Sequence, residues 1–407
     1  MKILLFSTLF PNAANPSLGV FVENRMQHLR KDCDVKVKVI APVPWFPFRS
    51  KVFGVYGQYA RAPKYEVRKG VEIWHPRYIT VPKVGMRITP TTLYHAGLRA
   101  AKKMIAEGFD FDVIDAHYLF PDGIAAAKIA KELGKPFTMT ARGSDVTEIG
   151  LMDPYRDWIK DACAAAGRVM TVSESLRQDL VDMTGENQKI STLRNGVDLT
   201  VFYPLDYKTS RKAILKEIGV DPSFNGKLIV SVGWLIPRKR HDLCIELMAR
   251  VDKAHLLIIG VGPEETALKL LVESLGLEGR VHFIGRVDHE RLKVYHSGVD
   301  LLMLMSEREG WPNVLLEAMA CGTPVLARAV GGVEEFVNVP EAGLSVQTKT
   351  MEDIAQRYSQ LMAAYPKRED VRRYAESYSW EETSKAQWRI FSELTPNRDD
   401  EKDDRKC

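Results

Sequence analysis

The chain has 407 residues, more than one ordinary hydrophobic core holds, so we expect two domains or slightly more. Its apolar content of 45%, charged content of 27% and net charge of only +4 are those of a globular protein, and no apolar run is long enough to cross a bilayer. The first residues lack a secretory cleavage pattern, and the five cysteines (Cys33, Cys163, Cys244, Cys321 and Cys407) are widely spaced. We therefore expect a cytoplasmic protein with neither a disulfide framework nor a structural zinc site.

The first half of the chain alternates short β-rich apolar runs with helical patterns, which predicts a mainly parallel sheet covered by helices on both faces. The predicted strands are 2–8, 35–41, 71–74, 113–116, 137–140, 169–172 and 190–193, and the predicted helices include 20–29, 92–106, 124–133, 155–165 and 175–183.

The same alternation begins again after residues 195–222, which we interpret as a linker that contains a charged helical piece. Strands are predicted at 228–232, 256–259, 281–284, 301–305, 324–327 and 344–346, and helices at 242–251, 264–275, 290–296, 314–320 and 351–364. The fold class is α/β with two doubly wound domains, residues 1–200 and 205–378, and a cleft between them. Residues 396–407 are expected to be a disordered tail.

Basic and aromatic residues are mixed in one stretch. Between Lys31 and Arg87 there are twelve Lys or Arg against four Asp or Glu, interleaved with Trp, Phe and Tyr from Trp45 to Trp74. This mixture is typical of a surface that contacts anionic lipid, and it is equally typical of a solvated face with aromatics in the core. No nucleic-acid-binding module accompanies the charge, so we expect no nucleic-acid partner.

The stretch EGWPNVLLEAMACGTPV, residues 309–325, predicts a loop, a short helix and the entry to a buried strand. Pro312 and Asn313 are helix-start signals, and Gly322 and Pro324 are stop signals. Amides from Gly310 to Val314 would then form an anion-binding helix N-terminus between two carboxylates, Glu309 and Glu317. Taken alone, Glu317 can equally complement the helix dipole while Glu309 is a solvated loop residue.

In their order along the chain, several stretches resemble the retaining glycosyltransferases of family four, which have the GT-B fold of two facing Rossmann-like domains. The stretches are FDVIDAHYLFPDG, TARGSD, RNGVDLTVFYP, SVGWLIPRKRHD, IIGVGPEE, FIGRV and EGWPNVLLEAMACGTPV. The resemblance runs from residue 1 to about 395, and it implies that the helix in 379–395 crosses back onto the N-terminal domain.

The resemblance implies a nucleoside diphosphate sugar donor, UDP- or GDP-linked, with no cofactor and no metal. The leaving diphosphate gains negative charge, which Arg238 and Lys239 would stabilise. Glu317 would bind the ribose hydroxyls and Glu309 the donor sugar. The remaining donor contacts are assigned to Gly19, Gly310, Trp311, Pro312, Asn313, Val314, Gly285, Arg286 and Val287.

Two positions depart from the family pattern. Trp234 stands where an Arg usually follows the strand glycine, and Arg142 stands where many relatives carry His. Because an Arg cannot serve as a general base, Arg142 either stabilises an anionic group or marks a reaction that needs no protein base. His117 stands at the end of a predicted strand. It can either reach the cleft or be a histidine whose ring nitrogens are hydrogen-bonded within the protein. Asp110 and Asp112 imitate a metal motif but precede a strand, so we expect no metal site.

The sequence therefore predicts a metal-independent retaining glycosyltransferase that acts in cell-surface polysaccharide or glycolipid assembly. Its expected acceptor is a glycan or lipid-linked glycan, with peripheral contact to the inner face of the cell membrane. The alternatives are a catalytically silent sugar-nucleotide-binding protein and another GT-B enzyme, such as a nucleotide-sugar epimerase or an inverting transferase. A dehydrogenase is disfavoured, because Glu265 stands where the dinucleotide fingerprint after Gly260 and Gly262 requires glycine.

Overall fold

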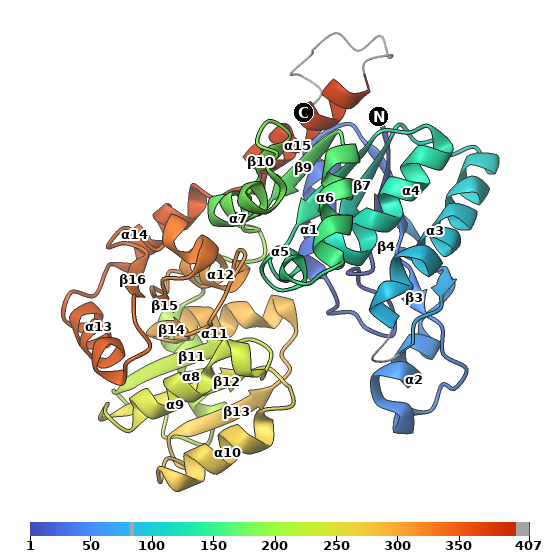
Figure 1. The fold of residues 1–407 in the computed structure, drawn as a ribbon. Coiled ribbons are helices and arrows are strands. Elements are labelled where there is room, and N and C mark those ends of the chain that lie inside the picture. Colours follow the sequence, from blue (N-terminus) through green and yellow to red (C-terminus); the bar gives the residue numbers. More distant parts are fainter. Residues whose placement is uncertain (82–84, 396–406) are drawn as a thin grey trace. The chain divides into compact units, whose positions relative to one another are not determined.

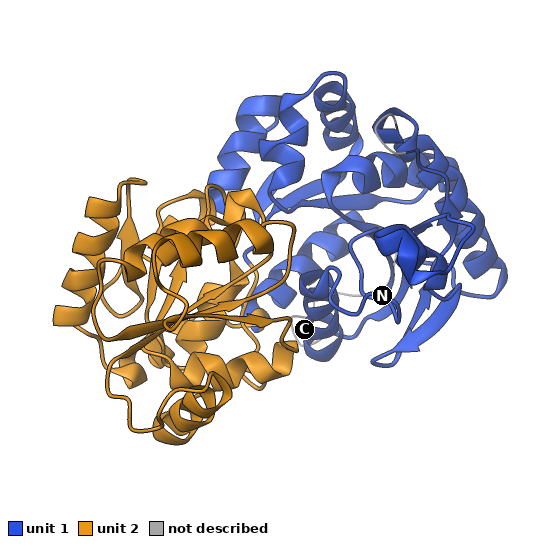
Figure 2. Cartoon of the chain, turned by 90° about the horizontal axis from the view of Figure 1, so that it is seen from below, with its two compact units in different colours: residues 1–194, 381–407 blue, residues 195–380 orange. Residues whose placement is uncertain are grey.

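The computed structural model describes residues 1–81, 85–395 and 407. Contacts divide the chain into two compact units (Figure 2). Unit 1 contains residues 1–194 and 381–407, and unit 2 contains residues 195–380. The expected tail at 396–407 lies outside the described residues, except for Cys407.

Unit 1 is built on an eight-stranded sheet (Figure 1) in the order β10-β9-β8-β7-β1-β2-β5-β4. Its strands are β1 (Lys2–Phe6), β2 (Lys36–Ile40), β4 (Tyr65–Arg68), β5 (Val71–Trp74), β7 (Val113–His117), β8 (Phe137–Ala141), β9 (Arg168–Thr171) and β10 (Ile190–Thr192). All neighbours pair in parallel except β4 and β5, which are antiparallel. A separate two-stranded ladder joins β3 (Val43–Pro44) to β6 (Arg77–Tyr78).

The helices of this unit are α1 (Val20–Asp32), α2 (Gly54–Arg61), α3 (Thr89–Ala106), α4 (Ile124–Leu133), α5 (Ser144–Thr147), α6 (Tyr155–Ala165), α7 (Glu174–Thr184) and most of α15 (Trp380–Leu394). Trp388, Ile390 and Phe391 of α15 belong to the same buried cluster as Ile3 and Leu5 of β1. The C-terminal helix is therefore part of the core of unit 1.

Unit 2 has six parallel strands in the order β13-β12-β11-β14-β15-β16. They are β11 (Lys227–Val232), β12 (Ala254–Ile259), β13 (Val281–Gly285), β14 (Leu301–Leu304), β15 (Val325–Arg328) and β16 (Gly343–Val346). The strand order reverses between β11 and β14, which is the doubly wound order of a Rossmann-like domain. The α/β class with two such domains is confirmed.

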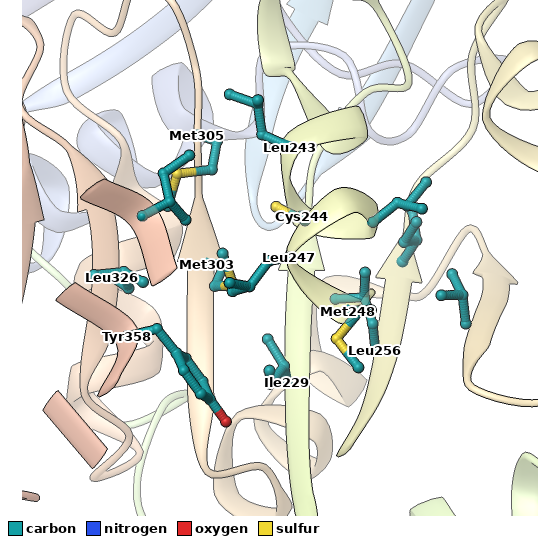
Figure 3. Packing of buried hydrophobic residues seen from close by; sticks show 14 of the residues in the cluster. Ile229, Leu243, Cys244, Leu247, Met248, Leu256, Met303, Met305, Leu326 and Tyr358 are labelled. Carbon is teal, nitrogen blue, oxygen red and sulfur yellow. The ribbon is translucent and has the colours of Figure 1, made fainter. Parts of the chain in front are cut away.

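The helices of unit 2 are α8 (Tyr207–Glu217), α9 (His241–Met248), α10 (Glu265–Ser274), α11 (Leu292–Gly298), α12 (Asn313–Ala320), α13 (Met351–Ala363) and α14 (Arg368–Glu376). Figure 3 shows Leu243 and Leu247 of α9 in the cluster with Ile229 of β11 and Met303 of β14. These strands are nearly continuous apolar runs because helices cover both of their faces.

Residues 195–222, which we interpreted as a linker, belong to unit 2 in the structure. Helix α8 contacts α11, and its Arg211 forms an ion pair of 2.9 Å with Asp300, each side chain being 11% exposed. Asp300 also accepts a hydrogen bond from the backbone N–H of Leu228 at the start of β11. The helical piece was predicted, but its charged sequence gave no sign that it packs in unit 2 through a buried ion pair.

We expected no disulfide framework, and the structure has one disulfide that the sequence did not predict, between Cys33 and Cys407. The two residues are 374 positions apart, so their pairing leaves no local spacing pattern. Cys163, Cys244 and Cys321 are free and buried, as expected for small core thiols. Within residues 1–81, 85–395 and 407, none of the helices has the length and apolar character that a bilayer span requires.

Replacing Arg211 with Met should lower the unfolding free energy of the protein by about 3 kcal/mol, because the buried Asp300 carboxylate loses its close cation and keeps the more distant Lys227, 3.9 Å away. Urea denaturation followed by circular dichroism measures this change. The control Lys269→Met removes the exposed partner of Glu265 and should change stability by less than about 0.5 kcal/mol. Equal effects of the two variants would contradict a structural role for the buried pair.

Candidate functional site

The carboxyl ends of β11 and β14 lie on either side of the point where the strand order of unit 2 reverses. In doubly wound sheets, ligands bind at this point, in the space outside the strand ends. The loop after β11 carries Arg238 and Lys239, and the loop after β14 carries Glu309. The topology therefore brings Arg238 and Lys239 close to Glu309, which follows Lys239 by 70 positions.

An ion pair joins the two loops. The Lys239 ammonium lies 2.6 Å from Glu309 Oε1, and the two side chains are only 17% and 9% exposed. Backbone contacts hold the same loops together, because the Arg238 guanidinium donates to the carbonyl of Arg308 and the Glu307 N–H donates to the carbonyl of Arg238. A cation and a carboxylate are thus held at the carboxyl ends of the central strands β11 and β14, with little freedom to move.

Glycine at position 331 is required by the Glu309 loop. Gly331 has a φ of +52°, and a Cβ atom built on it would lie 1.9 Å from the carbonyl oxygen of Glu309. Any other residue would push this loop away and lengthen the Lys239–Glu309 contact. Sequence reasoning missed Gly331, although the GG pair after a predicted strand is a turn signal.

The three adjacent basic residues of the β11 loop have different partners. Arg240 is bound to Asp242 at 2.7 Å and lies 3.5 Å from Glu307, which raises its pKa further. Arg238 is bound to a backbone carbonyl, and Lys239 alone is paired with Glu309. The group is therefore an ordered set of contacts rather than a solvated turn.

Helix α12 begins at Asn313, directly after Pro312, as the start signals predicted. Its first turn is anchored from inside unit 2, because Trp311 Nε1 donates to the carbonyl of Asn195 at 3.0 Å and Asn195 Nδ2 donates to Asn313 Oδ1 at 3.3 Å. The Trp311 ring is buried against Phe336. What Trp311 and Asn313 can offer a ligand is therefore their backbone, with the positive end of the helix dipole behind it.

Glu317 lies in the middle of α12 with its side chain 13% exposed. Its Oε1 lies 3.1 Å from Nε2 of His289, in the short 3-10 helix His289–Arg291 that follows β13. This contact ties α12 to the loop of Gly285, Arg286 and Val287. Sequence reasoning missed His289, since a contact between two separate elements leaves no spacing signal.

Together these groups suit one kind of ligand. The Lys239 ammonium and the α12 N-terminus can hold an anionic group such as a diphosphate. Glu317 and Glu309 can accept hydrogen bonds from hydroxyls on either side of it.

Unit 1 has its own switch point, between β1 and β7. The loop after β1 leads to Gly19, whose φ is +62° and whose Cβ, if present, would lie 2.1 Å from the carbonyl oxygen of Leu9. Only glycine fits this close approach at the start of α1. The need for glycine at position 19 is therefore explained by its packing against Leu9, and it is not by itself evidence that the N-terminus of α1 binds a ligand.

His117, the last residue of β7, is 1% exposed and both of its ring nitrogens are occupied. Arg142 donates to His117 Nδ1 at 2.6 Å, so Nε2 carries the proton and donates to Asp115 Oδ2 at 3.1 Å. Burial lowers the pKa of His117 to about 4, against the opposing charge of Asp115 and with the help of Arg142. His117 is therefore neutral at pH 7 and orients Arg142.

Arg142 keeps its charge in this setting. Burial, and then the nearby charge of Arg25, lowers the pKa of its guanidinium to about 9, which is still above neutral pH. The guanidinium also lies 5.2 Å from the centre of the Phe21 ring. Asp145 caps the turn, because it accepts from the backbone N–H groups of Arg142, Gly143 and Leu119.

A buried chain of contacts connects Arg142 to the C-terminal helix. Asp115 accepts from Gln387 Nε2 of α15 at 2.9 Å, and Gln387 Oε1 accepts from Arg25 of α1 at 2.8 Å. Sequence reasoning missed Arg25 and Gln387, which are 362 residues apart. The C-terminal helix thus supports the position of Arg142 through Asp115 and His117.

The two aspartates that imitate a metal motif have other partners. Asp110 is paired with Lys135 at 2.7 Å, and Asp112 accepts from the backbone N–H of Lys2. Among the residues that the structure describes, His, Cys, Asp and Glu form no group of three that could hold a metal ion.

Two family models match the chain. The model for glycosyl transferases group 1 matches residues 220–378, and the model for glycosyltransferase family 4 matches residues 19–201. Together they match well over half of the chain.

Curated relatives carry related names. A Bacillus subtilis (strain 168) glycosyltransferase, TuaC, assigned to teichuronic acid biosynthesis, is 28% identical over 345 residues, which cover 83% of each protein. The N-acetyl-alpha-D-glucosaminyl L-malate synthase of Bacillus anthracis is 28% identical over 66% of this chain and 70% of its own length. A D-inositol 3-phosphate glycosyltransferase of Mycobacteroides abscessus is 29% identical over 67% of this chain and 63% of its own.

Solved structures share the fold over nearly the whole chain. Sucrose-phosphate synthase of Thermosynechococcus elongatus has a TM-score of 0.78 at 19% identity and covers 98% of this chain and 100% of its own. Anabaena HepE, solved in complex with UDP-glucose, has a TM-score of 0.71 at 16% identity and covers 97% of this chain and 100% of its own.

The His117 imidazole should stay neutral, as the Nε2–H tautomer, down to about pH 4. NMR of the ring nitrogens, assigned with His117→Gln, measures its titration. Because the folded pKa lies below the unfolded value of 6.5, the unfolded chain binds more protons between pH 6.5 and 4. His117 should therefore cost about 1–2 kcal/mol of stability when the pH falls from 7 to 5, and His117→Gln should lose this dependence. A titration midpoint near 6.5 would contradict the buried arrangement.

Proposed function

Because the chain belongs to the group 1, family 4 glycosyltransferases and has the GT-B fold, we propose that it is a retaining, metal-independent enzyme of cell-surface polysaccharide or glycolipid assembly. It transfers a hexose-type sugar from a nucleoside diphosphate sugar, UDP- or GDP-linked, to an acceptor hydroxyl. The observation that carries this proposal is the Lys239–Glu309 pair beside the N-terminus of α12, at the switch point of unit 2.

The donor is bound by unit 2. Its diphosphate lies between Lys239, Arg238 and the amides from Gly310 to Val314, where positive charge is concentrated. The ribose hydroxyls donate to Glu317, which His289 holds in place at 3.1 Å. The backbone of Gly285 to Val287 flanks the base. HepE is named as a UDP-glucose complex, which favours a uridine donor for this chain.

The reaction breaks the bond between the anomeric carbon and the diphosphate oxygen and forms a bond from that carbon to the acceptor oxygen on the same face. The acceptor's proton passes to the departing phosphate oxygen, so no protein base is needed. Lys239 and Arg238 stabilise the charge that develops on this oxygen. Glu309 keeps Lys239 in place before the donor arrives and accepts from hydroxyls of the donor sugar.

Arg142 supplies a fixed positive charge on unit 1, and His117 positions it rather than acting as a base. The names of two relatives contain L-malate and D-inositol 3-phosphate, both anionic compounds. We therefore infer that the acceptor carries an anionic group, such as the phosphate of a lipid-linked glycan, that Arg142 meets.

A second candidate is a catalytically silent sugar-nucleotide-binding protein. It is favoured by Trp234, which is 64% exposed where the family usually places an Arg. Incubation with labelled nucleotide sugars and a lipid extract separates the two: transfer of label to lipid supports the enzyme, and binding without turnover for every donor supports the silent protein.

Replacing Lys239 with Met should lower kcat by about 10²–10³, because one preorganised donor to a developing oxyanion is lost. Replacing Glu317 with Ala should instead weaken donor binding about 10- to 100-fold, because hydrogen bonds to a carboxylate are lost. Steady-state kinetics with the preferred donor separates these effects. The matched control Lys349→Met removes an exposed ammonium from Glu307, two residues before Glu309, and should leave both constants within about twofold. Normal kinetics in Lys239→Met or Glu317→Ala would contradict the assignment.

Addition of EDTA should leave the transfer rate within about twofold, since Lys239, Arg238 and the α12 amides supply the positive charge that a metal would otherwise provide. The rate is measured before and after dialysis against the chelator. A loss of activity that Mg²⁺ or Mn²⁺ restores would show that the diphosphate is stabilised by a metal.

A further inference from the structure

Unit 1 exposes a turn rich in apolar side chains between β3 and the end of α2. Every residue from Phe48 to Tyr56 is exposed. Val52 is 90% exposed and Phe48 57%, and Trp45, just before them, is 56% exposed. Scattered surface apolar residues are ordinary, but a contiguous set of this kind marks an interaction site.

The turn is structured. Its aromatic rings pack on one another, with Phe48 and Phe53 stacked at 5.2 Å and Phe46 at 5.5 Å from Phe53. The Arg61 guanidinium of α2 donates to the carbonyl of Arg49 at 2.8 Å. The apolar side chains are therefore exposed on a turn whose conformation is fixed by its own ring packing and hydrogen bonds.

A second exposed apolar stretch lies beside the first. The β3–β6 ladder continues in the hydrogen bond from the Trp45 N–H to the Tyr78 carbonyl, and the next residue, Ile79, is 59% exposed. Val81, Met86 and Ile88 are exposed as well. Residues 45–56, 79–81 and 86–88 are called the basic–aromatic surface below; Figure 1 shows α2 and β3 at one end of unit 1.

The charge of the basic–aromatic surface has one sign. The sequence has no Asp or Glu at all between residues 35 and 65 or between residues 73 and 106. Arg49, Lys51, Arg61 and Arg87 are exposed on or next to the surface. Cations around exposed aromatic and aliphatic side chains are the combination that binds the headgroup region of an anionic bilayer.

We propose that unit 1 docks on membranes that contain anionic lipid through the basic–aromatic surface. Two copies of this chain would bring like charges together if they met through it. A nucleic acid would meet the cations but would leave aliphatic side chains such as Val52 and Val55 without apolar partners. A lipid bilayer satisfies both, with phosphates for the cations and acyl chains for the apolar turn.

This surface is connected to the loop that leads to Gly19. Gln58 of α2 donates to the carbonyl of Ala14 at 2.6 Å, in the segment between β1 and Gly19. Docking would therefore place the acceptor side of unit 1 next to the bilayer, where a lipid-linked acceptor is presented. That last step rests on the proposed function, whereas the docking itself does not.

Flotation with vesicles of phosphatidylcholine, with or without phosphatidylglycerol, tests the proposal. The protein should float with the anionic vesicles and remain largely unbound with the neutral ones. The double variant Arg49→Gln, Lys51→Gln should weaken partition into anionic vesicles about 25-fold, since each cation near an anionic surface is worth about fivefold. The double variant Val52→Ser, Val55→Ser should weaken it about tenfold through lost apolar burial.

The matched control Leu270→Ser, at an apolar position on α10 of unit 2 whose exposed fraction lies between those of Val52 and Val55, should bind vesicles as the unmodified protein does. Titration of every variant with UDP and GDP checks the fold and the donor site, and should give unchanged affinities. Vesicle binding without nucleotide binding would leave the docking in place and overturn the proposed function.

Three results would overturn the docking proposal. The first is equal binding, or no binding, to the two kinds of vesicle. The second is unchanged binding by both double variants. The third is a concentration-dependent dimer that Val52→Ser, Val55→Ser abolishes while vesicle binding is absent, which would make the surface a contact between copies of this chain.

Discussion

The ion pair between Lys239 and Glu309 is the contact on which the site of unit 2 depends. A doubly wound parallel sheet places the loops after β11 and β14 side by side, but it does not fix how they face each other. That geometry is fixed by the 2.6 Å pair, by the hydrogen bond from the Arg238 guanidinium to the Arg308 carbonyl and by the close packing of Gly331 on Glu309. Both side chains are largely buried, so removing either one would leave the other charge buried without its partner. The cation is therefore preorganised, and little reorganisation is required when negative charge develops beside it.

In unit 1 the positive charge is the Arg142 guanidinium, and a chain of hydrogen bonds holds it in place. Arg142 is held by a neutral histidine, and that histidine is held by Asp115, which in turn accepts from Gln387 of the C-terminal helix. The network explains why a buried, neutral His117 stands at the end of β7, where a free histidine would have suggested a base. It also explains why the last helix of the chain packs in the first unit, since removing α15 would remove the amide that satisfies Asp115. A positioned guanidinium suits an anionic acceptor and a reaction in which the departing phosphate takes the proton.

Much of the fold could be predicted from the sequence, because buried parallel strands are short apolar runs and the helices between them have start and stop signals. Lys239, Glu309 and Glu317 could be named because each lies in a stretch that resembles the family. The partners of these residues could not be named. His289 on Glu317, Asn195 beneath Trp311 and Gln387 on Asp115 are contacts between elements far apart in sequence, and such contacts leave no periodicity or local spacing. The same reason hid the Cys33–Cys407 disulfide, and the charged sequence of α8 hid its packing in unit 2.

Crystal structures of the protein with UDP and with GDP would show directly which groups hold the diphosphate. We expect the diphosphate within hydrogen-bond distance of the Lys239 ammonium and of the backbone N–H groups at the start of α12, with the ribose hydroxyls on Glu317. A nucleotide bound away from these groups, or a diphosphate held only through a metal ion with Lys239 still closed on Glu309, would contradict this expectation.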